Sequence, residues 1–178
     1  MRVIAGSKRG RPLKVPRGNE VRPTLERTRE ALFNILGPRL QGARFLDLFA
    51  GTGANGIEAL SRGAAHALFV DSDRRAIAVV RENLARTGLG ERAAIRRLNL
   101  PPQLAKIQGP FDLVFADPPY TFEHHDALLA GLGAHGLVAE GGLVVLEHGK
   151  TPAPAPIVAP FEQVRQQHYG DTWLSFYA

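Results

Sequence analysis

The chain has 178 residues, of which 44% are hydrophobic and 22% charged, with a formal net charge of +5 and no cysteine. This composition is typical of one soluble globular domain with a substantial core, and the lack of cysteine excludes disulfides and thiolate metal sites. No apolar run approaches the roughly 18 residues of a membrane span, and the histidines show no metal-ligand spacing, so we expect a cytoplasmic, monomeric protein without a membrane segment or a metal.

The positive charge is concentrated at the start of the chain. Residues 1–29 contain nine Lys or Arg and two Glu, a balance of +7, whereas the remaining 149 residues have a balance of −2. Gly and Pro preclude a long helix over residues 1–23, for which we expect a basic arm with one small strand pair. Such an arm is typical of proteins that bind a polyphosphate partner, although a solubilising tail is the alternative. The cations expected to contact a phosphate backbone are Arg2, Lys8, Arg9, Arg11, Lys14 and Arg22.

Residues 24–178 are expected to form one domain of alternating strands and helices. Thr24 is the expected N-cap of a helix that runs to Leu36, and Gly37-Pro38 ends that helix. Further helices are predicted over residues 55–62, 73–86 and 126–132. Strands are predicted over residues 44–49, 67–71, 93–98, 111–116 and 143–147. Repeated βα alternation predicts an α/β fold with a doubly wound, mostly parallel sheet.

The last part of the chain departs from that alternation. A Pro-rich connector over residues 151–156 is followed by strand patterns over 161–169 and 172–177, which flank a Gly170-Asp171 turn. These two strands complete a seven-stranded sheet with a C-terminal antiparallel hairpin. A closing hairpin of this kind is typical of the Rossmann-like class I methyltransferase sheet and is absent from ordinary nucleotide-binding Rossmann sheets.

A glycine-rich loop joins the first predicted strand to its helix. Gly51, Gly53 and Gly56 satisfy the GxGxxG pattern, and Asp71 follows Gly51 by 20 residues, which is also the fingerprint of a dinucleotide site. Asp47 distinguishes a dinucleotide from S-adenosyl-L-methionine. A carboxylate beside the loop repels the pyrophosphate of a dinucleotide and attracts the ammonium of a methionine moiety. We therefore expect S-adenosyl-L-methionine. Its expected binding residues are Asp47, Phe49, Gly51, Thr52, Gly53, Asp71, Ser72, Asn99 and Leu100.

The predicted strand over residues 111–116 runs into Asp117-Pro118-Pro119-Tyr120. The two prolines fix an extended corner that displays the Asp117 carboxylate and the Pro118 carbonyl and offers no backbone donor at 118 or 119. Such acceptors suit a ligand that brings two N–H groups, and Tyr120 adds a flat surface for stacking. A proline-terminated strand followed by an exposed Tyr is the simpler interpretation. Asp117, Pro118 and Tyr120 are the expected catalytic residues.

The corner resembles the Asp/Asn-Pro-Pro-aromatic motif of methyltransferases that act on planar amino nitrogens. The chain as a whole resembles the bacterial small-subunit ribosomal RNA guanine-N2 methyltransferase family that modifies guanine 966. Beyond the glycine loop and the Asp112–Tyr120 stretch, the resemblance rests on Gly10-Arg11-Pro12-Leu13, Arg22-Pro23-Thr24, Arg29-Glu30-Ala31-Leu32-Phe33-Asn34 and residues 56–63. Asn55 departs from the family, which usually has an apolar residue there.

The resemblance implies methylation of the N2 amino group of a guanine in 16S rRNA, with the assembled small ribosomal subunit preferred to free RNA. The alternatives are an amino methyltransferase acting on DNA adenine, another RNA position or a protein amide, and an RNA-binding assembly factor without activity. The short arm leaves no room for the target-reading domain that a sequence-specific DNA adenine methyltransferase normally needs.

Overall fold

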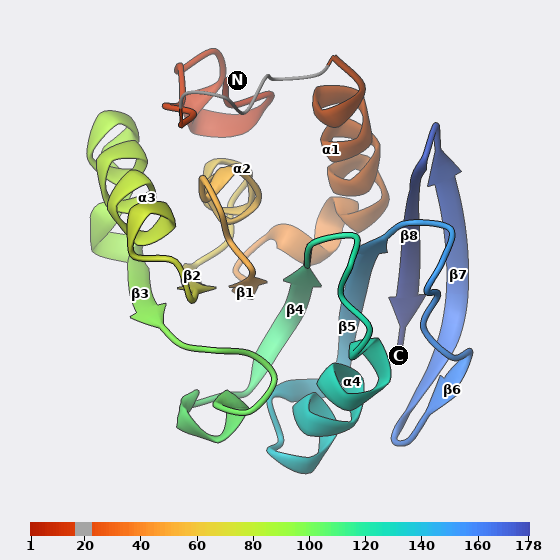
Figure 1. Ribbon diagram of the computed structural model, residues 1–178. Helices are drawn as coiled ribbons and strands as arrows, with labels where there is room; N and C mark the ends of the chain where they lie inside the picture. Colours follow the sequence, from red (N-terminus) through yellow and green to blue (C-terminus); the bar gives the residue numbers. More distant parts are fainter. Residues whose placement is uncertain (17–22) are drawn as a thin grey trace.

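The computed structural model describes residues 1–16 and 23–178, which form one mostly parallel sheet flanked by helices (Figure 1). The strand order is β3-β2-β1-β4-β5-β8-β7-β6. Strands β1 to β5 pair in parallel, and β5, β8, β7 and β6 pair antiparallel. The strands are β1 Arg44–Leu48, β2 His66–Asp71, β3 Ala93–Arg97, β4 Phe111–Ala116, β5 Val138–His148, β6 Ile157–Val158, β7 Phe161–Tyr169 and β8 Thr172–Tyr177.

Helices cover both faces of this sheet. The α-helices are α1 Pro23–Leu36, α2 Ala54–Ser61, α3 Arg74–Thr87 and α4 His125–Ala134. Short 3-10 turns lie at η1 Gly6–Lys8, η2 Gly37–Leu40, η3 Gly90–Arg92 and η4 Leu104–Lys106. Figure 1 shows α1, α2 and α3 on one face and α4 on the other. Successive strand residues point to opposite faces, so Phe45 and Leu46 belong to two separate core clusters.

The predicted fold class is confirmed, with corrections to its details. The described sheet has eight strands rather than seven, because the two-residue strand β6 pairs with the edge of β7. Helix α1 includes Pro23, which places Thr24 inside the helix and not before it as an N-cap. Strand β5 begins at Val138, earlier than predicted, and its pairing with β4 shifts register between Phe111 and Leu113.

The N-terminal segment packs against the helices. Val3 and Leu13 are buried in the core cluster on the α1–α3 face, and Arg2 forms an antiparallel bridge with Pro12. The Ile4 and Ala5 amides donate to the buried Glu58 carboxylate of α2 at 2.8 and 2.9 Å. The expected small strand pair is therefore reduced to a single bridge, and the division into an arm over 1–23 and a domain over 24–178 stays a prediction.

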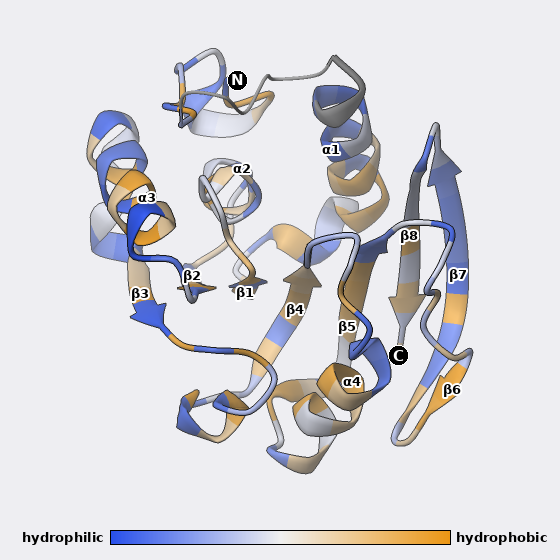
Figure 2. Cartoon of the chain, viewed as in Figure 1, coloured by the Kyte–Doolittle hydropathy of each residue, from blue (hydrophilic) through white to orange (hydrophobic). Residues whose placement is uncertain are grey.

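Hydropathy follows this architecture. Figure 2 shows hydrophobic residues in the inner strands and a hydrophilic outer side on α3.

The sheet ends at β6, where Ile157 is 70% exposed. This edge strand is only two residues long and lies between Pro156 and Pro160, and both features oppose pairing with another chain. None of the described helices is both long and apolar enough to cross a membrane.

Candidate active site

Acidic side chains gather where the parallel strands end. Asp47 lies near the end of β1, Glu147 near the end of β5, and Asp117 directly follows β4. All three lie on the α1–α3 face, because the residues two positions earlier belong to the core cluster of that face: Phe45, Phe115 and Val145. Carboxyl ends of neighbouring parallel strands meet at one edge of a sheet, which is where α/β proteins bind ligands.

The glycine loop between β1 and α2 has an unusual backbone that is held by Asp71. Phe49, Gly51 and Gly53 have positive φ angles of 57°, 56° and 76°. The Asp71 carboxylate accepts from the Gly51 amide at 2.9 Å and from the Asp73 amide at 2.9 Å. Each carboxylate oxygen has a second lone pair, so Asp71 can shape the loop and still accept from a ligand hydroxyl.

Asp47 stabilises the helix end of the same loop. Its buried Oδ2 accepts from the Gly56 amide at 2.8 Å. Burial, followed by the charges of Asp117 and Asp71, raises the pKa of Asp47 well above its usual range, while the Gly56 hydrogen bond opposes that rise. Asp47 therefore fixes the start of α2, and its pairing with a methionine ammonium stays a prediction.

Gly56 is needed for close packing of α2 on the sheet. A Cβ atom at this position would lie well under 3.0 Å from the ring of Phe69, which is fully buried in β2. We expect Gly56→Ala to destabilise the fold by about 1–3 kcal/mol, because the added Cβ would overlap a fully buried ring and force it or the helix to shift. Chemical unfolding measures this, with Gly90→Ala as the control, since a Cβ there meets nothing within 4 Å. Equal stability of both variants would contradict this packing role.

A cavity of about 200 Å³ lies between the glycine loop, α1 and the ends of β4 and β5. Four of the expected site residues line it: Phe49, Gly51, Thr52 and Asp117. Its other lining residues are Met1, Thr28, Arg29, Leu32, Ala50, Ala54, Asn55 and Glu147. The remaining expected site residues do not line it: Asp47, Gly53, Asp71, Ser72, Asn99, Leu100, Pro118 and Tyr120.

Asp117 and Glu147 are the titratable acids of this cavity. Burial raises the pKa of Asp117 to about 7. Burial and then the charge of Asp117 raise the pKa of Glu147 well above its usual range. Within residues 1–16 and 23–178, neither carboxylate has a hydrogen-bond donor or an ion-pair partner. The cavity therefore favours a ligand with N–H donors or positive charge.

The corner after β4 is held at both ends. The Asp117 amide donates to the Leu48 carbonyl at 3.3 Å, and the Phe122 amide donates to the Pro119 carbonyl at 2.8 Å. Tyr120 is 49% exposed, and its hydroxyl hydrogen-bonds Thr172 Oγ1 of β8 at 2.9 Å. Tyr120 is thus tied to the C-terminal hairpin while its ring stays available for stacking.

The remaining expected cofactor residues follow β2 and β3. Ser72 is exposed and directly follows Asp71 at the end of β2. Asn99 is also exposed, and its amide donates to Gln103 Oε1 at 2.8 Å, whereas the Leu100 side chain is buried. These residues lie along the same carboxyl edge, so they could extend a binding surface from the cavity towards β3.

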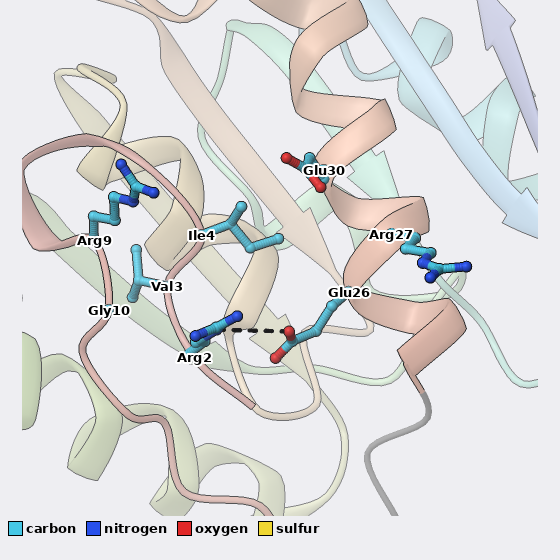
Figure 3. Close-up of a pocket in the computed structure, with 8 residues that line it drawn as sticks. All are labelled: Arg2, Val3, Ile4, Arg9, Gly10, Glu26, Arg27 and Glu30. Carbon is cyan, nitrogen blue, oxygen red and sulfur yellow. Dashed lines mark ion pairs between the residues drawn. The ribbon is translucent and has the colours of Figure 1, made fainter.

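A groove of about 400 Å³ separates the N-terminal segment from α1 (Figure 3). It is lined by Arg2, Val3, Ile4, Arg9, Gly10, Glu26, Arg27 and Glu30. Arg2 pairs with Glu26 across the groove at 3.8 Å, and Lys14 pairs with Glu82 of α3. Among the described residues, Lys8, Arg9 and Arg11 form no ion pair. Arg22 lies outside the described residues.

Sequence reasoning missed two charged residues that line the cavity, Arg29 of α1 and Glu147 of β5. The Arg29 guanidinium donates through Nη2 to the Arg2 carbonyl at 2.6 Å, which joins α1 to the N-terminal segment. Burial lowers the pKa of Arg29, against the opposing charges of Glu58 and Glu26. Glu147 could have been found, because it is an acid at the end of a buried strand, as Asp47 and Asp117 are.

Known proteins resemble this chain over most of its length. The family model described as "Conserved hypothetical protein 95" matches residues 1–178. Ribosomal RNA small subunit methyltransferase D of Escherichia coli K12 is 40% identical over 147 residues, which cover 83% of this chain and 74% of that protein. The protein of the same name from Haemophilus influenzae is 33% identical and covers 90% of this chain and 83% of its own length.

A solved structure has the same fold as this chain. A hypothetical protein from Thermus thermophilus superposes with a TM-score of 0.81 at 37% identity, covering 99% of this chain and 98% of that one. The resemblance inferred from the sequence motifs is thereby confirmed. The chain belongs to the conserved hypothetical protein 95 family, together with the ribosomal RNA small subunit methyltransferases D.

Proposed function

We propose that this protein transfers a methyl group from S-adenosyl-L-methionine to the exocyclic N2 amino group of a guanine in 16S rRNA. The observation that carries the proposal is the unpartnered carboxylate of Asp117, the first residue of the Asp-Pro-Pro-Tyr corner, which lines the same cavity as the glycine loop. The relatives of this chain support the substrate class, since they are named ribosomal RNA small subunit methyltransferases. We expect it to act as a cytoplasmic monomer on the assembled small ribosomal subunit.

The described residues fit this cofactor. The cavity contains two unpartnered carboxylates, which favour a ligand with a sulfonium and an ammonium and disfavour a pyrophosphate. Gly51 and Gly53 allow close approach of a ligand to the backbone, and Asp71 can accept from ribose hydroxyls at the end of β2. When bound, the cofactor supplies an activated methyl group.

The protein's own groups orient the amine that receives the methyl. A guanine amino group is a poor nucleophile because its lone pair is delocalised into the ring. Acceptance of its two N–H groups by the Asp117 carboxylate and the Pro118 carbonyl would fix its direction and balance the positive charge that develops on nitrogen. Tyr120 would hold the ring by stacking, worth about 1–3 kcal/mol. The released proton has a nearby acceptor in Asp117.

The free cations of the N-terminal segment are proposed to bind the RNA backbone. We expect the double variant Arg9→Gln/Arg11→Gln to weaken RNA binding and to reduce the magnitude of the slope of log K against log salt by roughly 1.4–1.8, since each phosphate contact contributes about 0.7–0.9. Filter binding over a salt series measures this slope. Lys14→Gln is the matched control, because Glu82 already pairs with Lys14 and the expected change is small. The same slope in the double variant and wild type would refute the assignment.

Point substitutions are preferable to a truncation of the segment. Val3 and Leu13 are part of the core, and Met1 lines the cavity. Removal of the segment would therefore expose apolar surface and disturb the site along with the RNA contacts.

The substrate class can be tested by methyl incorporation. Purified protein is incubated with radiolabelled S-adenosyl-L-methionine and, in separate reactions, small ribosomal subunits, free 16S rRNA, DNA and ribosomal proteins. We expect label in the rRNA, with more in the assembled subunit than in free RNA. Label found only in DNA or only in protein would reject an rRNA substrate. A protein that binds the cofactor and RNA but labels nothing would favour an assembly factor.

A further inference from the structure

Glu147 is a buried acid to which the methyl-transfer step described above assigns no role. It is 8% exposed, and it lines the same cavity as Asp117. Within the described parts of the chain its carboxylate has neither a hydrogen-bond donor nor an ion pair. Burial of a charged group without a partner is strongly unfavourable. The arrangement therefore calls for a ligand that brings a donor to Glu147.

Glu147 and Asp117 are held side by side. Ala116 of β4 pairs with Leu146 of β5, so the two acids follow in register on adjacent strands, which lie about 4.8 Å apart. Glu147 is fixed from the other side as well, since it pairs with Leu174 of β8. The next residue, His148, is anchored at both ring nitrogens, to the Gly149 carbonyl at 2.6 Å and to Ser175 Oγ at 2.8 Å.

We propose that Glu147 selects guanine by accepting the N1–H of the target base while Asp117 and Pro118 accept its N2–H groups. This inference rests on the proposed function and adds a residue that determines specificity. Guanine has N1–H directly beside its 2-amino group, so its donors lie side by side as the two acids do. The N1–H of bound guanine favours the charged form of Glu147. A purine without a hydrogen on N1 presents a lone pair there, which the charged carboxylate repels.

The competing occupant of Glu147 is a positive centre of the cofactor. A metal ion is a poorer candidate, because the described residues contain no group of three His, Cys, Asp or Glu that could hold one. The cofactor and the base can be separated by experiment, because only the base changes when the RNA is varied. Cofactor affinity and base preference therefore need to be measured for the same variants.

The test compares guanine with 2-aminopurine at the methylated nucleotide of reconstituted small subunits. 2-Aminopurine keeps the 2-amino group but has no hydrogen on N1. The wild type should prefer guanine. Glu147→Gln, whose amide can both donate and accept, should reduce the guanine to 2-aminopurine ratio of kcat/KM by about ten- to a hundredfold. Glu140→Gln, at an exposed acid of the same strand, should leave the ratio unchanged.

Cofactor titration and thermal unfolding of each variant complete the test. An unchanged ratio in a folded Glu147→Gln variant would overturn the inference, and a simultaneous loss of cofactor affinity would assign Glu147 to the cofactor. If that variant does not fold, Glu147→Asp should slow guanine methylation more than 2-aminopurine methylation. Equal slowing of both substrates would overturn the inference. Failure of the wild type to methylate the guanine substrate would instead reject the proposed function itself.

Discussion

Asp117→Ala is expected to lower methyl transfer by about a thousandfold or more while cofactor binding survives. The carboxylate is the charged acceptor that follows β4. Without it the guanine amino group is not oriented, and the positive charge that develops on its nitrogen is not balanced. Single-turnover kinetics measures the transfer step, and titration with S-adenosylhomocysteine measures the cofactor site. Asp112→Ala, at an exposed acid of the same strand whose carboxylate accepts from the Arg44 amide, is the control and should stay active.

The same residue should set the pH dependence of the reaction. The charged form of Asp117 is the one that balances a developing cation, and burial raises its pKa to about 7. Because kcat/KM reports the free enzyme, it should rise with pH through about 7 in the wild type. Near-normal transfer by Asp117→Ala, or a flat profile between pH 5 and 9, would remove Asp117 from the mechanism.

Asp117→Asn is expected to make the protein more stable than the wild type at pH 8. In the unfolded chain an Asp ionises near 3.9, whereas the pKa of Asp117 in the folded protein is raised to about 7. Between about pH 4 and about pH 7 the folded protein therefore holds a proton on Asp117 that the unfolded chain has lost. The stability that this proton provides is fully present below about pH 4 and is lost as pH rises through about 7. Asn has no charge to bury, so the variant avoids this loss.

Thermal unfolding at two pH values tests this stability effect. At pH 8 the variant should melt higher, by about 2–4 °C for each kcal/mol gained, and the difference should shrink towards zero at pH 4. His125 and His148 have pKa values lowered by burial, which adds stability as pH rises, but they are the same in both proteins. A variant less stable than the wild type at pH 8 would show that Asp117 is favourably paired in the folded state.

The parts of the fold that were predictable from the sequence are those with local signals. The strand over residues 111–116 and the hairpin strands around Gly170 match their predicted bounds, because apolar runs and turn residues mark their ends. The start of β5 was missed because Gly141 and Gly142 interrupt its pattern, and a register shift absorbs them. Strand β6 carries only two residues and exists because β7 lies beside it.

The site divides in the same way. The glycine loop and Asp117 were found because each lies in a continuous motif. Glu147 also lies at the end of a buried strand, but its position beside Asp117 depends on the pairing of β4 with β5, which no local pattern reveals. The basic residues show the same limit, since Arg2 and Lys14 meet Glu26 and Glu82 from distant helices and lose part of the charge expected for RNA binding.

The most direct measurement is the identity of the methylated nucleoside. Small ribosomal subunits that lack the modification are treated with the protein and radiolabelled S-adenosyl-L-methionine, and the RNA is digested and separated by chromatography. The proposed function predicts that the label migrates with N2-methylguanosine, and that Asp117→Ala removes it. Label in N6-methyladenosine, or in another methylated nucleoside, would contradict transfer to the guanine 2-amino group.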